Sequence, residues 1–285
     1  MISENKKNYP AFSVAISVYG GDNADYFDLA LKSIMNQTIP PDEIVLIIDG
    51  PVSDTIEKVI KKHEKGTIPF TIIKFKKNKG LGMALKVAVE HAHHNIIARM
   101  DSDDIAYKNR FALQLQAMCN YSADIVGGQI SEFDNSEKKI IGYRIVPLKH
   151  KDICEEMKKR CPLNHMTVMF KKNAVLQAGN YRSLIFNEDY FLWIRMMESG
   201  CIFMNLKNVL VNVRCGKDMY KRRGGQQYFK SECTIQKFML NRKIISPIQY
   251  IINISKRFIV QIILPNHVRG LIIRKFARIH PLDIS

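Results

Sequence analysis

Short apolar runs alternate with amphipathic segments along the first hundred residues of the chain. The runs are rich in Val and Ile and carry few polar side chains, a pattern typical of strands that are buried on both faces of a sheet. The segments between them repeat apolar residues at helical spacing. Regular alternation of strand and helix predicts a parallel sheet with right-handed crossovers. The expected strands are residues 12–19, 43–49, 70–75 and 95–100, and the expected helices are residues 26–35, 83–93 and a segment that ends near residue 63.

The pattern becomes less regular after residue 104. A mostly loop-forming stretch is expected from residue 134 to residue 150. The last forty residues mix Ile, Leu and Val with Lys and Arg, which predicts one or two amphipathic basic helices. Further helices are expected at residues 109–118, 173–178, 188–198 and 226–241, and further strands at residues 124–133 and 167–170.

Composition and charge restrict the possible partners. The chain has 285 residues, of which 46% are apolar and 25% charged, as in ordinary globular proteins. Its net charge of +16 indicates an anionic partner. Residues 201–285 contain 16 Lys and Arg against 3 Asp and Glu, so the excess belongs to the C-terminal third. A basic function is therefore regional.

The cysteines and the beginning of the chain favour a cytosolic protein. The six cysteines show no Cys-x-x-Cys spacing, and the polar start Met1-Ile-Ser-Glu-Asn-Lys-Lys7 is not a signal peptide. We expect reduced thiols. No apolar run approaches the length that spans a bilayer, so the protein is expected to be soluble or peripheral.

Polar residues follow three of the expected parallel strands. Tyr19 and Asp49 end the first two strands, and Asp101 follows the fourth. The carboxyl ends of parallel strands meet at one edge of a sheet, where a nucleotide is the commonest ligand. Gly80-Leu-Gly82 lacks the third glycine of a dinucleotide fingerprint, and no Gly-Lys-Ser/Thr loop is present. These absences disfavour a dehydrogenase or a kinase.

The turn Asp101-Ser-Asp-Asp104 contains candidate metal ligands. Asp101 and Asp103 point the same way in an extended chain and are placed to share one divalent cation, for which Mg²⁺ or Mn²⁺ is the suitable ion. Asp104 points elsewhere, and we expect it to cap the following helix. The same residues also suit a polar turn with a helix cap and no metal.

A second pair of carboxylates, Glu188 and Asp189, begins the expected helix 188–198. Acidic side chains stabilise the first turn of any helix. A catalytic carboxylate at this position has the same local pattern, so the sequence leaves both interpretations open.

Taken together, these features resemble the family 2 glycosyltransferases of bacterial surface polysaccharide assembly, a group that includes O-antigen and amylovoran glycosyltransferases. The resemblance covers about residues 12–225, and its specificity lies in the order and spacing of several motifs. The motifs are Ser13-Val-Ala-Ile-Ser-Val-Tyr19, Ser33-Ile-Met-Asn-Gln-Thr38, Asn78-Lys-Gly-Leu-Gly82, Ala98-Arg-Met-Asp-Ser-Asp-Asp104, Asn164-His165, Glu188-Asp-Tyr-Phe-Leu-Trp193 and Met219-Tyr-Lys-Arg-Arg-Gly-Gly225.

The resemblance implies an α/β protein of the GT-A fold, with a Rossmann-like, mostly parallel sheet and a nucleotide-sugar site at the C-terminal edge of its strands. The catalytic domain would cover residues 1–225, with a nucleotide-sugar half up to about residue 104 and an acceptor half from residue 105. Residues 226–285 would form a basic helical extension. The implied reaction transfers a hexose, galactose or glucose, from a UDP-sugar to a saccharide on a polyprenyl diphosphate, with inversion at the anomeric carbon.

The resemblance also implies roles for single residues. Asp103, assisted by Asp101, would hold Mn²⁺ or Mg²⁺. Asp189 would be the general base, with Glu188 beside it. Related sequences often have Asp-Asp where this chain has Ile48-Asp49, and Asn where it has Lys86. The nucleotide-binding residues that it implies are Tyr19, Asp49, Gly80, Lys86 and Asp101.

Four other residues have two interpretations each. The resemblance places His165 and Trp193 near the acceptor, whereas a lone histidine before an apolar strand is also typical of a structural residue. Arg222 and Arg223, which precede two glycines, are suited to close over a diphosphate. The alternative for these arginines is a solvated basic loop.

The basic tail, residues 246–285, is expected either to lie on an anionic membrane at the inner face of the cell membrane or to pack on the catalytic domain. Two rival functions fit the sequence less well. A nucleotidyltransferase also uses paired aspartates and Mg²⁺, but it does not explain Glu188 and Asp189. A nucleic-acid-binding protein is disfavoured because the chain has no stacking aromatic platform, helix-turn-helix or zinc-finger spacing.

Overall fold

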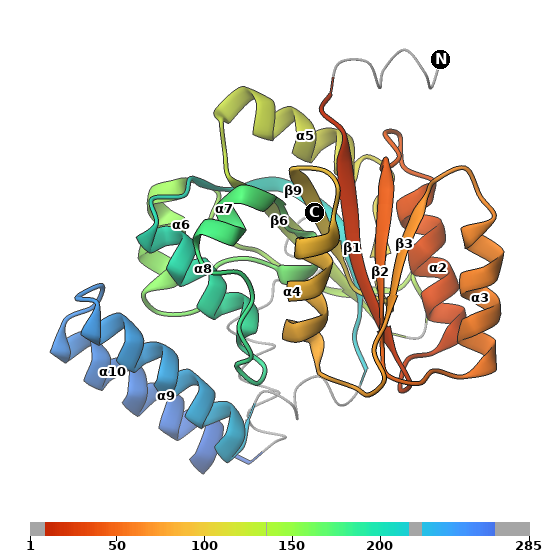
Figure 1. Cartoon of the computed structure of the whole chain (residues 1–285). Helices are drawn as coiled ribbons and strands as arrows, with labels where there is room; N and C mark the ends of the chain where they lie inside the picture. The colour runs from red at the N-terminus through yellow and green to blue at the C-terminus, as the bar shows by residue number, and fades with distance from the viewer. Residues whose placement is uncertain (1–8, 135, 217–223, 266–285) are drawn as a thin grey trace.

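The computed structural model describes residues 9–134, 136–216 and 224–265. A nine-stranded sheet runs through the described residues in the order β3-β2-β1-β4-β8-β6-β9-β5, and β7 pairs with β6 off this path (Figure 1). The two halves of the chain contribute different strands to the same sheet. The N-terminal half provides a parallel part and the second half a mixed part.

The parallel part confirms the expected alternation of strand and helix. Its four strands are parallel neighbours, and β1 pairs with β2 in the register that places Tyr19 beside Asp49. All seven residues of β2 are buried, as the continuous apolar run predicts. The elements are β1 (Phe12–Tyr19), α2 (Ala24–Met35), β2 (Glu43–Asp49), α3 (Asp54–Glu64), β3 (Phe70–Lys74), α4 (Leu81–His91) and β4 (Ile96–Met100).

The mixed part contains the two expected strands, β6 and β8, and three that were not expected, β5, β7 and β9. β8 is antiparallel to both β4 and β6, whereas β6 and β9 are parallel. The expectation of a loop from residue 134 to residue 150 is wrong in part, because β7 lies within it and pairs with β6. The elements are β5 (Ile105–Ala106), α5 (Arg110–Tyr121), β6 (Ile125–Phe133), β7 (Ile140–Arg144), α6 (His150–Met157), η1 (His165–Thr167), β8 (Met169–Lys171), α7 (Lys172–Gln177), α8 (Glu188–Glu198) and β9 (Phe203–Arg214).

Helices cover the sheet on both faces, and each face has its own apolar core. Phe27 of α2 and Phe111 of α5 belong to one core, which also includes residues of α3. Leu85 of α4 and Trp193 of α8 belong to the other, to which α6, α7 and α9 contribute. The second core therefore joins α4 of the N-terminal part of the chain to α8 of the second part.

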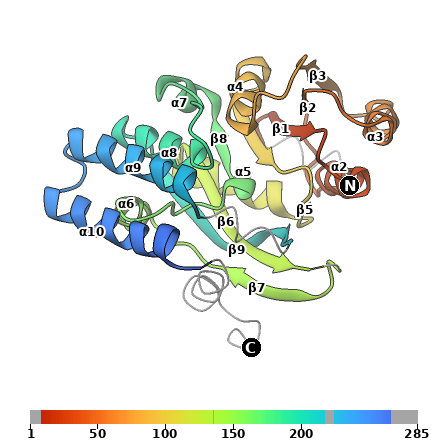
Figure 2. The same cartoon turned by 90° about the horizontal axis from the view of Figure 1, so that it is seen from below.

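The C-terminal helices form an antiparallel hairpin beside the sheet domain (Figures 1 and 2). α9 (Gln226–Asn241) and α10 (Pro247–Phe258) are followed by the short η3 (Ile259–Ile263). Asn253 of α10 donates hydrogen bonds to the Lys158 carbonyl (2.9 Å) and to Gln236 Oε1 (2.8 Å). One face of α10 thus packs on the protein. None of the helices in the described ranges is both long enough and apolar enough to cross a membrane.

Candidate active site

The first two predicted polar strand ends meet closely at one edge of the sheet. Tyr19 ends β1 beside Asp49 of β2, and its side chain is 47% exposed. The turn after β1 passes directly over the turn after β2. A Cβ on Gly20 would lie only 2.8 Å from the Pro51 carbonyl oxygen, so this approach requires glycine.

Asp49 organises the loop that leads into α4. Its two carboxylate oxygens accept hydrogen bonds from the backbone N–H groups of Lys79 (2.6 Å) and Gly80 (2.9 Å). Gly80 has a φ of +85°, which glycine adopts without strain. Asp49 is buried, and it fixes the position of Gly80. Contact between Asp49 and the base of a nucleotide stays a prediction.

The acidic turn after β4 is joined by a residue from the turn after β1 that the sequence analysis did not single out, Asp22. Ser102 Oγ donates to Asp22 Oδ2 at 2.8 Å, and the Tyr19 N–H donates to the same oxygen at 3.1 Å. Partial burial of the carboxyl group and the nearby carboxylates of Asp101 and Asp22 together raise the pKa of Asp103 to about 6. Several carboxylates therefore share this site with too little positive charge to balance them.

Asp104 does not have the predicted capping role. It is 2% exposed, and its Oδ1 accepts a hydrogen bond from the Arg214 N–H of β9 at 2.9 Å. The following helix, α5, has Asn109 at its N-cap and no side-chain cap bond. The expectation of a cap is wrong, because Asp104 accepts a hydrogen bond from the end of β9 where the short strand β5 begins to pair with it.

Arg99 of β4 is a second residue that the sequence analysis did not assign. It is 2% exposed, and its guanidinium pairs with both oxygens of Asp101, with an Nη1–Oδ2 distance of 2.5 Å. An arginine within a buried, otherwise apolar strand was the available signal, since a buried charge needs a partner. Arg99 places a fixed positive charge beneath the acidic turn.

The predicted catalytic pair, Glu188 and Asp189, begins a helix that lies against α4. A Cβ on Gly82 of α4 would lie 3.2 Å from Glu188 Cβ, so the start of α8 packs directly against the start of α4. Burial and the neighbouring Asp189 carboxylate raise the pKa of Glu188 to about 7, although the positive charge of Arg99 opposes this increase. The structure thus brings both predicted groups of carboxylates around Arg99.

Asp189 has mostly uncharged neighbours. Its Oδ2 lies 3.9 Å from His165 Nδ1 and 3.9 Å from Cys161 Sγ. Burial raises the pKa of Asp189, whereas the positive charges of Arg99 and Arg144 oppose this increase. Burial, assisted by Arg99, holds the pKa of His165 well below its usual value, so the imidazole beside Asp189 is neutral at pH 7.

His165 is placed by aromatic neighbours. Its Nε2 hydrogen-bonds with the Tyr181 hydroxyl at 2.9 Å, and its ring lies edge-on to Trp193 at 5.9 Å between centroids. Trp193 is 0% exposed. The expectation that Trp193 meets the acceptor is wrong, because the enclosed indole packs behind His165 and has no open surface.

The remaining predicted residues are less informative. Lys86 is in the second turn of α4, and its carbonyl accepts a hydrogen bond from Asn180 at 3.2 Å. Arg222 and Arg223 lie outside the described residues.

The acidic turn has the donor chemistry for a divalent cation but not a complete set of ligands. Among the described residues, no group of three or more His, Cys, Asp or Glu side chains is placed to hold a metal ion. Asp103 is exposed to solvent and is surrounded by other carboxylates. Hard oxygen ligands with unbalanced negative charge suit Mg²⁺ or Mn²⁺, which complete their coordination with water and phosphate oxygens. The residues therefore fit a cation that arrives with an anionic ligand.

Solved structures share this fold. The 1–349 fragment of S. aureus TarS in complex with UDP-GlcNAc superposes with a TM-score of 0.66 and 15% identity over 87% of this chain and 72% of that chain. This chain covers 43% of the longer S. aureus TarS structure. The mannosyltransferase PcManGT from Pyrobaculum calidifontis, in complex with GDP-Man and Mn²⁺, has a TM-score of 0.64 and 14% identity over 97% of this chain and 78% of that one. These similarities establish the expected GT-A architecture.

Sequence relatives are closer. The chain is 38% identical to the amylovoran biosynthesis glycosyltransferase AmsE of Erwinia amylovora over 81% of this chain and 86% of AmsE. It is 36% identical to the UDP-Gal:alpha-D-GlcNAc-diphosphoundecaprenol beta-1,3-galactosyltransferase of Escherichia coli over 94% of this chain and 97% of that protein. The model of glycosyl transferase family 2 matches residues 13–180. The chain is therefore a glycosyltransferase and belongs to family 2.

Proposed function

We propose that the protein transfers a hexose, galactose or glucose, from a UDP-sugar to a saccharide carried on a polyprenyl diphosphate, in the biosynthesis of O-antigen or another surface polysaccharide. The main support is the convergence of two groups of carboxylates around Arg99. Asp103 belongs to the group at the C-terminal edge of the parallel strands, and Asp189 begins the helix that packs against α4. The substrates of the Escherichia coli relative support the choice of donor and acceptor.

On the donor side, Asp103 would hold Mn²⁺ or Mg²⁺, with Asp101 in support. Such a cation supplies Lewis-acid stabilisation to the negative charge that develops on a departing diphosphate. Arg99 fixes Asp101 through an ion pair, and this pair restricts the position of the turn that contains Asp103. Asp49 and Gly80 define the neighbouring loop, where the nucleotide would lie, and Tyr19 offers an exposed ring beside it.

On the acceptor side, Asp189 would remove the proton from the attacking hydroxyl. Inversion requires attack on the face of the donor sugar opposite the departing diphosphate, with a base within hydrogen-bond reach. Burial raises the pKa of Asp189, which makes the carboxylate a stronger base. The positive charges of Arg99 and Arg144 oppose this increase and so favour the ionised form of the carboxyl group.

The outer face of α10 supports a peripheral position on the cytoplasmic side of the membrane. Ile248 and Ile251 are 72% and 62% exposed, and the apolar row continues into η3 with Ile263 at 59%. An exposed apolar helical face beside Lys256 suits the headgroup region of an anionic leaflet. We define the isoleucine face as Ile248, Ile251, Ile252, Ile259 and Ile263. The basic residues Arg269, Arg274, Lys275 and Arg278 lie outside the described residues.

Vesicle flotation tests this position. Replacing Ile248 and Ile251 together by Ser should reduce binding to vesicles that contain anionic lipid, and high salt should weaken the binding of the wild-type protein. Ile202, which is 43% exposed on the catalytic domain, provides the matched control when replaced by Ser. Unchanged flotation of the double variant would remove the isoleucine face as the membrane contact.

A product screen tests the function itself. The protein is incubated with UDP-, GDP- and dTDP-sugars and a GlcNAc diphosphate lipid, with Mn²⁺ or Mg²⁺, and the lipid products are identified by mass spectrometry. We expect hexose transfer from a UDP-sugar that stops when the cation is chelated. Nucleoside triphosphates in parallel test the rival nucleotidyltransferase. Nucleotide transfer without sugar transfer would refute the proposed function.

A further inference from the structure

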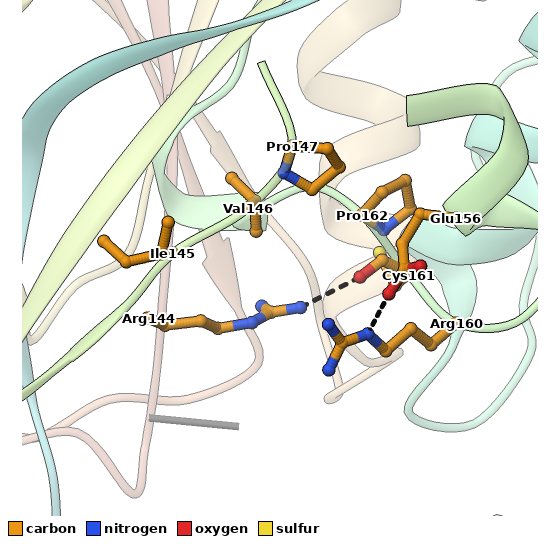
Figure 3. Close-up of a pocket in the computed structure, with 8 residues that line it drawn as sticks. All are labelled: Arg144, Ile145, Val146, Pro147, Glu156, Arg160, Cys161 and Pro162. Carbon is orange, nitrogen blue, oxygen red and sulfur yellow. Dashed lines mark hydrogen bonds and ion pairs between the residues drawn. The ribbon is translucent and has the colours of Figure 1, made fainter. Parts of the chain in front are cut away.

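A small pocket with two arginines opens next to the proposed base (Figure 3). Arg144, the last residue of β7, and Arg160, beyond the end of α6, reach into the same space from opposite sides. The pocket is lined by Arg144, Ile145, Val146, Pro147, Glu156, Arg160, Cys161 and Pro162. None of these residues has a role in the donor site described above.

The two arginines differ in how firmly they are held. Arg144 Nη2 donates to the Cys161 carbonyl at 2.9 Å, which fixes the guanidinium against the pocket wall. The Arg160 side chain is 60% exposed and pairs with the carboxylate of Glu156, one helical turn earlier. One guanidinium is thus preorganised, and the other is held only by a solvated ion pair.

Cys161 joins this pocket to the proposed base. Its carbonyl accepts the hydrogen bond from Arg144, and its Sγ lies 3.9 Å from Asp189 Oδ2. The positive charge of Arg144 acts on Asp189 as well, since it opposes the increase that burial causes in the pKa of that carboxyl. The pocket therefore begins one residue away from the site of proton transfer.

We infer that Arg144 and Arg160 bind the diphosphate that joins the acceptor saccharide to its lipid. The inference rests on the proposed function, because it takes Asp189 as the base and a lipid-linked saccharide as the acceptor. In an acceptor with a single sugar, such as the GlcNAc-diphosphoundecaprenol named for the Escherichia coli relative, the attacking hydroxyl and the diphosphate are attached to the same sugar. A site for that diphosphate must then lie within the span of one sugar from Asp189. Guanidinium groups bind phosphate oxygens through paired, charge-assisted hydrogen bonds.

The pocket is also connected to the isoleucine face. Asn253 and Arg257 of α10 donate to the carbonyls of Lys158 and Lys159, at 2.9 Å and 2.7 Å. These two lysines directly precede Arg160 in the chain. A diphosphate at the membrane surface would therefore meet the pocket when α10 lies on the bilayer, with the lipid chain remaining in the membrane.

Glu156 makes the inference testable in both directions. Its carboxylate competes with any anion for Arg160. Arg160→Gln should weaken diphosphate binding, whereas Glu156→Gln should strengthen it by releasing the guanidinium. If Arg160 and Glu156 served only to hold the end of α6, both substitutions would act in the same direction.

The experiment compares a GlcNAc diphosphate lipid with a phosphate-free alkyl GlcNAc glycoside as acceptors. The measured quantity is the ratio of kcat/KM for the two acceptors. We expect Arg160→Gln to lower this ratio about tenfold, the order expected from one lost charged hydrogen bond, and Glu156→Gln to raise it. Arg242→Gln is the matched control, because Arg242 also pairs with a glutamate and its side chain is 57% exposed.

A binding measurement separates the two proposals. Farnesyl diphosphate is titrated into each variant by calorimetry in metal-free buffer, which prevents retention at the donor site. Weaker binding to Arg160→Gln than to wild type would support the pocket even if the wild-type protein transferred no sugar, an outcome that would refute only the proposed function. Active wild-type enzyme with the same acceptor ratio in Arg160→Gln, or a lowered ratio in Glu156→Gln, would overturn the inference.

Discussion

Asp103 and Asp189 are the same type of residue in two different electrostatic environments. Loss of hydration raises the pKa of both carboxyl groups. Asp103 keeps part of its side chain in solvent and lies among other carboxylates, and the charges of Asp101 and Asp22 also raise its pKa. Asp189 instead has a neutral imidazole and a thiol at 3.9 Å. Like charges around Asp103 call for a cation, whereas the neutral surroundings of Asp189 favour proton transfer.

Arg99 keeps these two environments distinct. It forms its ion pair with Asp101, within hydrogen-bond distance. Asp189 and Glu188 experience its positive charge only through space. One buried arginine therefore pairs with Asp101 in the acidic turn and, at longer range, opposes the increase in the pKa of the proposed base.

Replacing the base should have the largest effect. Asp189→Asn removes the proton acceptor without changing the size of the side chain, so transfer should fall by a factor of about 10² to 10⁴ while UDP-sugar binding persists. Initial rates and calorimetry measure the two quantities. Glu198→Gln, at the other end of α8, is the control. An Asp189→Asn variant that keeps more than about a tenth of the wild-type rate would exclude Asp189 as the base.

Replacing Asp103 should remove the proposed cation-binding group. Asp103→Ala should abolish the part of UDP affinity that depends on Mn²⁺. This loss of affinity should exceed the roughly tenfold to hundredfold loss that follows when a residue supporting a metal ligand is removed. Calorimetry of UDP with and without Mn²⁺ measures this difference. Asp25→Asn in the first turn of α2 serves as control. If UDP affinity with Mn²⁺ is unchanged in Asp103→Ala, the metal assignment is wrong.

The sequence predicted the parallel half of the fold well because its strands are buried on both faces. The predicted bounds of β1, β2 and α9 agree with the structure to the residue. β9 was missed because Asn205 and Asn212 interrupt its apolar pattern. Asn205 donates to the Pro147 carbonyl at 2.7 Å and Asn212 to the Glu137 carbonyl at 3.0 Å. Such long-range hydrogen bonds leave no local signal.

The candidate site was predictable only where its residues belong to local sequence motifs. Asp101, Asp103 and the pair at the start of α8 stand in local motifs. Asp22 has no such motif, and only the turn after β1 brings it to Ser102, eighty residues further along the chain. The ion pair between Arg99 and Asp101 was likewise not predictable from local sequence, since the burial of Arg99 depends on the packing of the whole sheet.

The pH dependence of stability should show a smaller effect at Glu188. The pKa of Glu188 is raised from 4.5, the ordinary value of an exposed glutamate, to about 7 in the folded protein. Between these pH values the folded state binds more protons than the unfolded state, so stability falls as the pH rises. Glu188→Gln should therefore increase the free energy of unfolding at pH 8 by about 1 to 2 kcal/mol, after a discount for solvent screening, with no gain near pH 4. Urea unfolding at both pH values measures this, and an equal gain at pH 4 would contradict the shifted pKa.

Asp22 offers the finest test of the comparison, because it influences Asp103 without being an expected metal ligand. Asp22→Asn keeps an oxygen to accept the hydrogen bonds from Ser102 and Tyr19 but removes one of the negative charges that raise the pKa of Asp103. Metal-dependent UDP affinity should then fall only about fivefold, an effect of the order of 1 kcal/mol between screened charges. The same calorimetric titration measures it. A loss as large as that of Asp103→Ala would instead make Asp22 a direct ligand, and no loss would mean that its charge does not reach the cation.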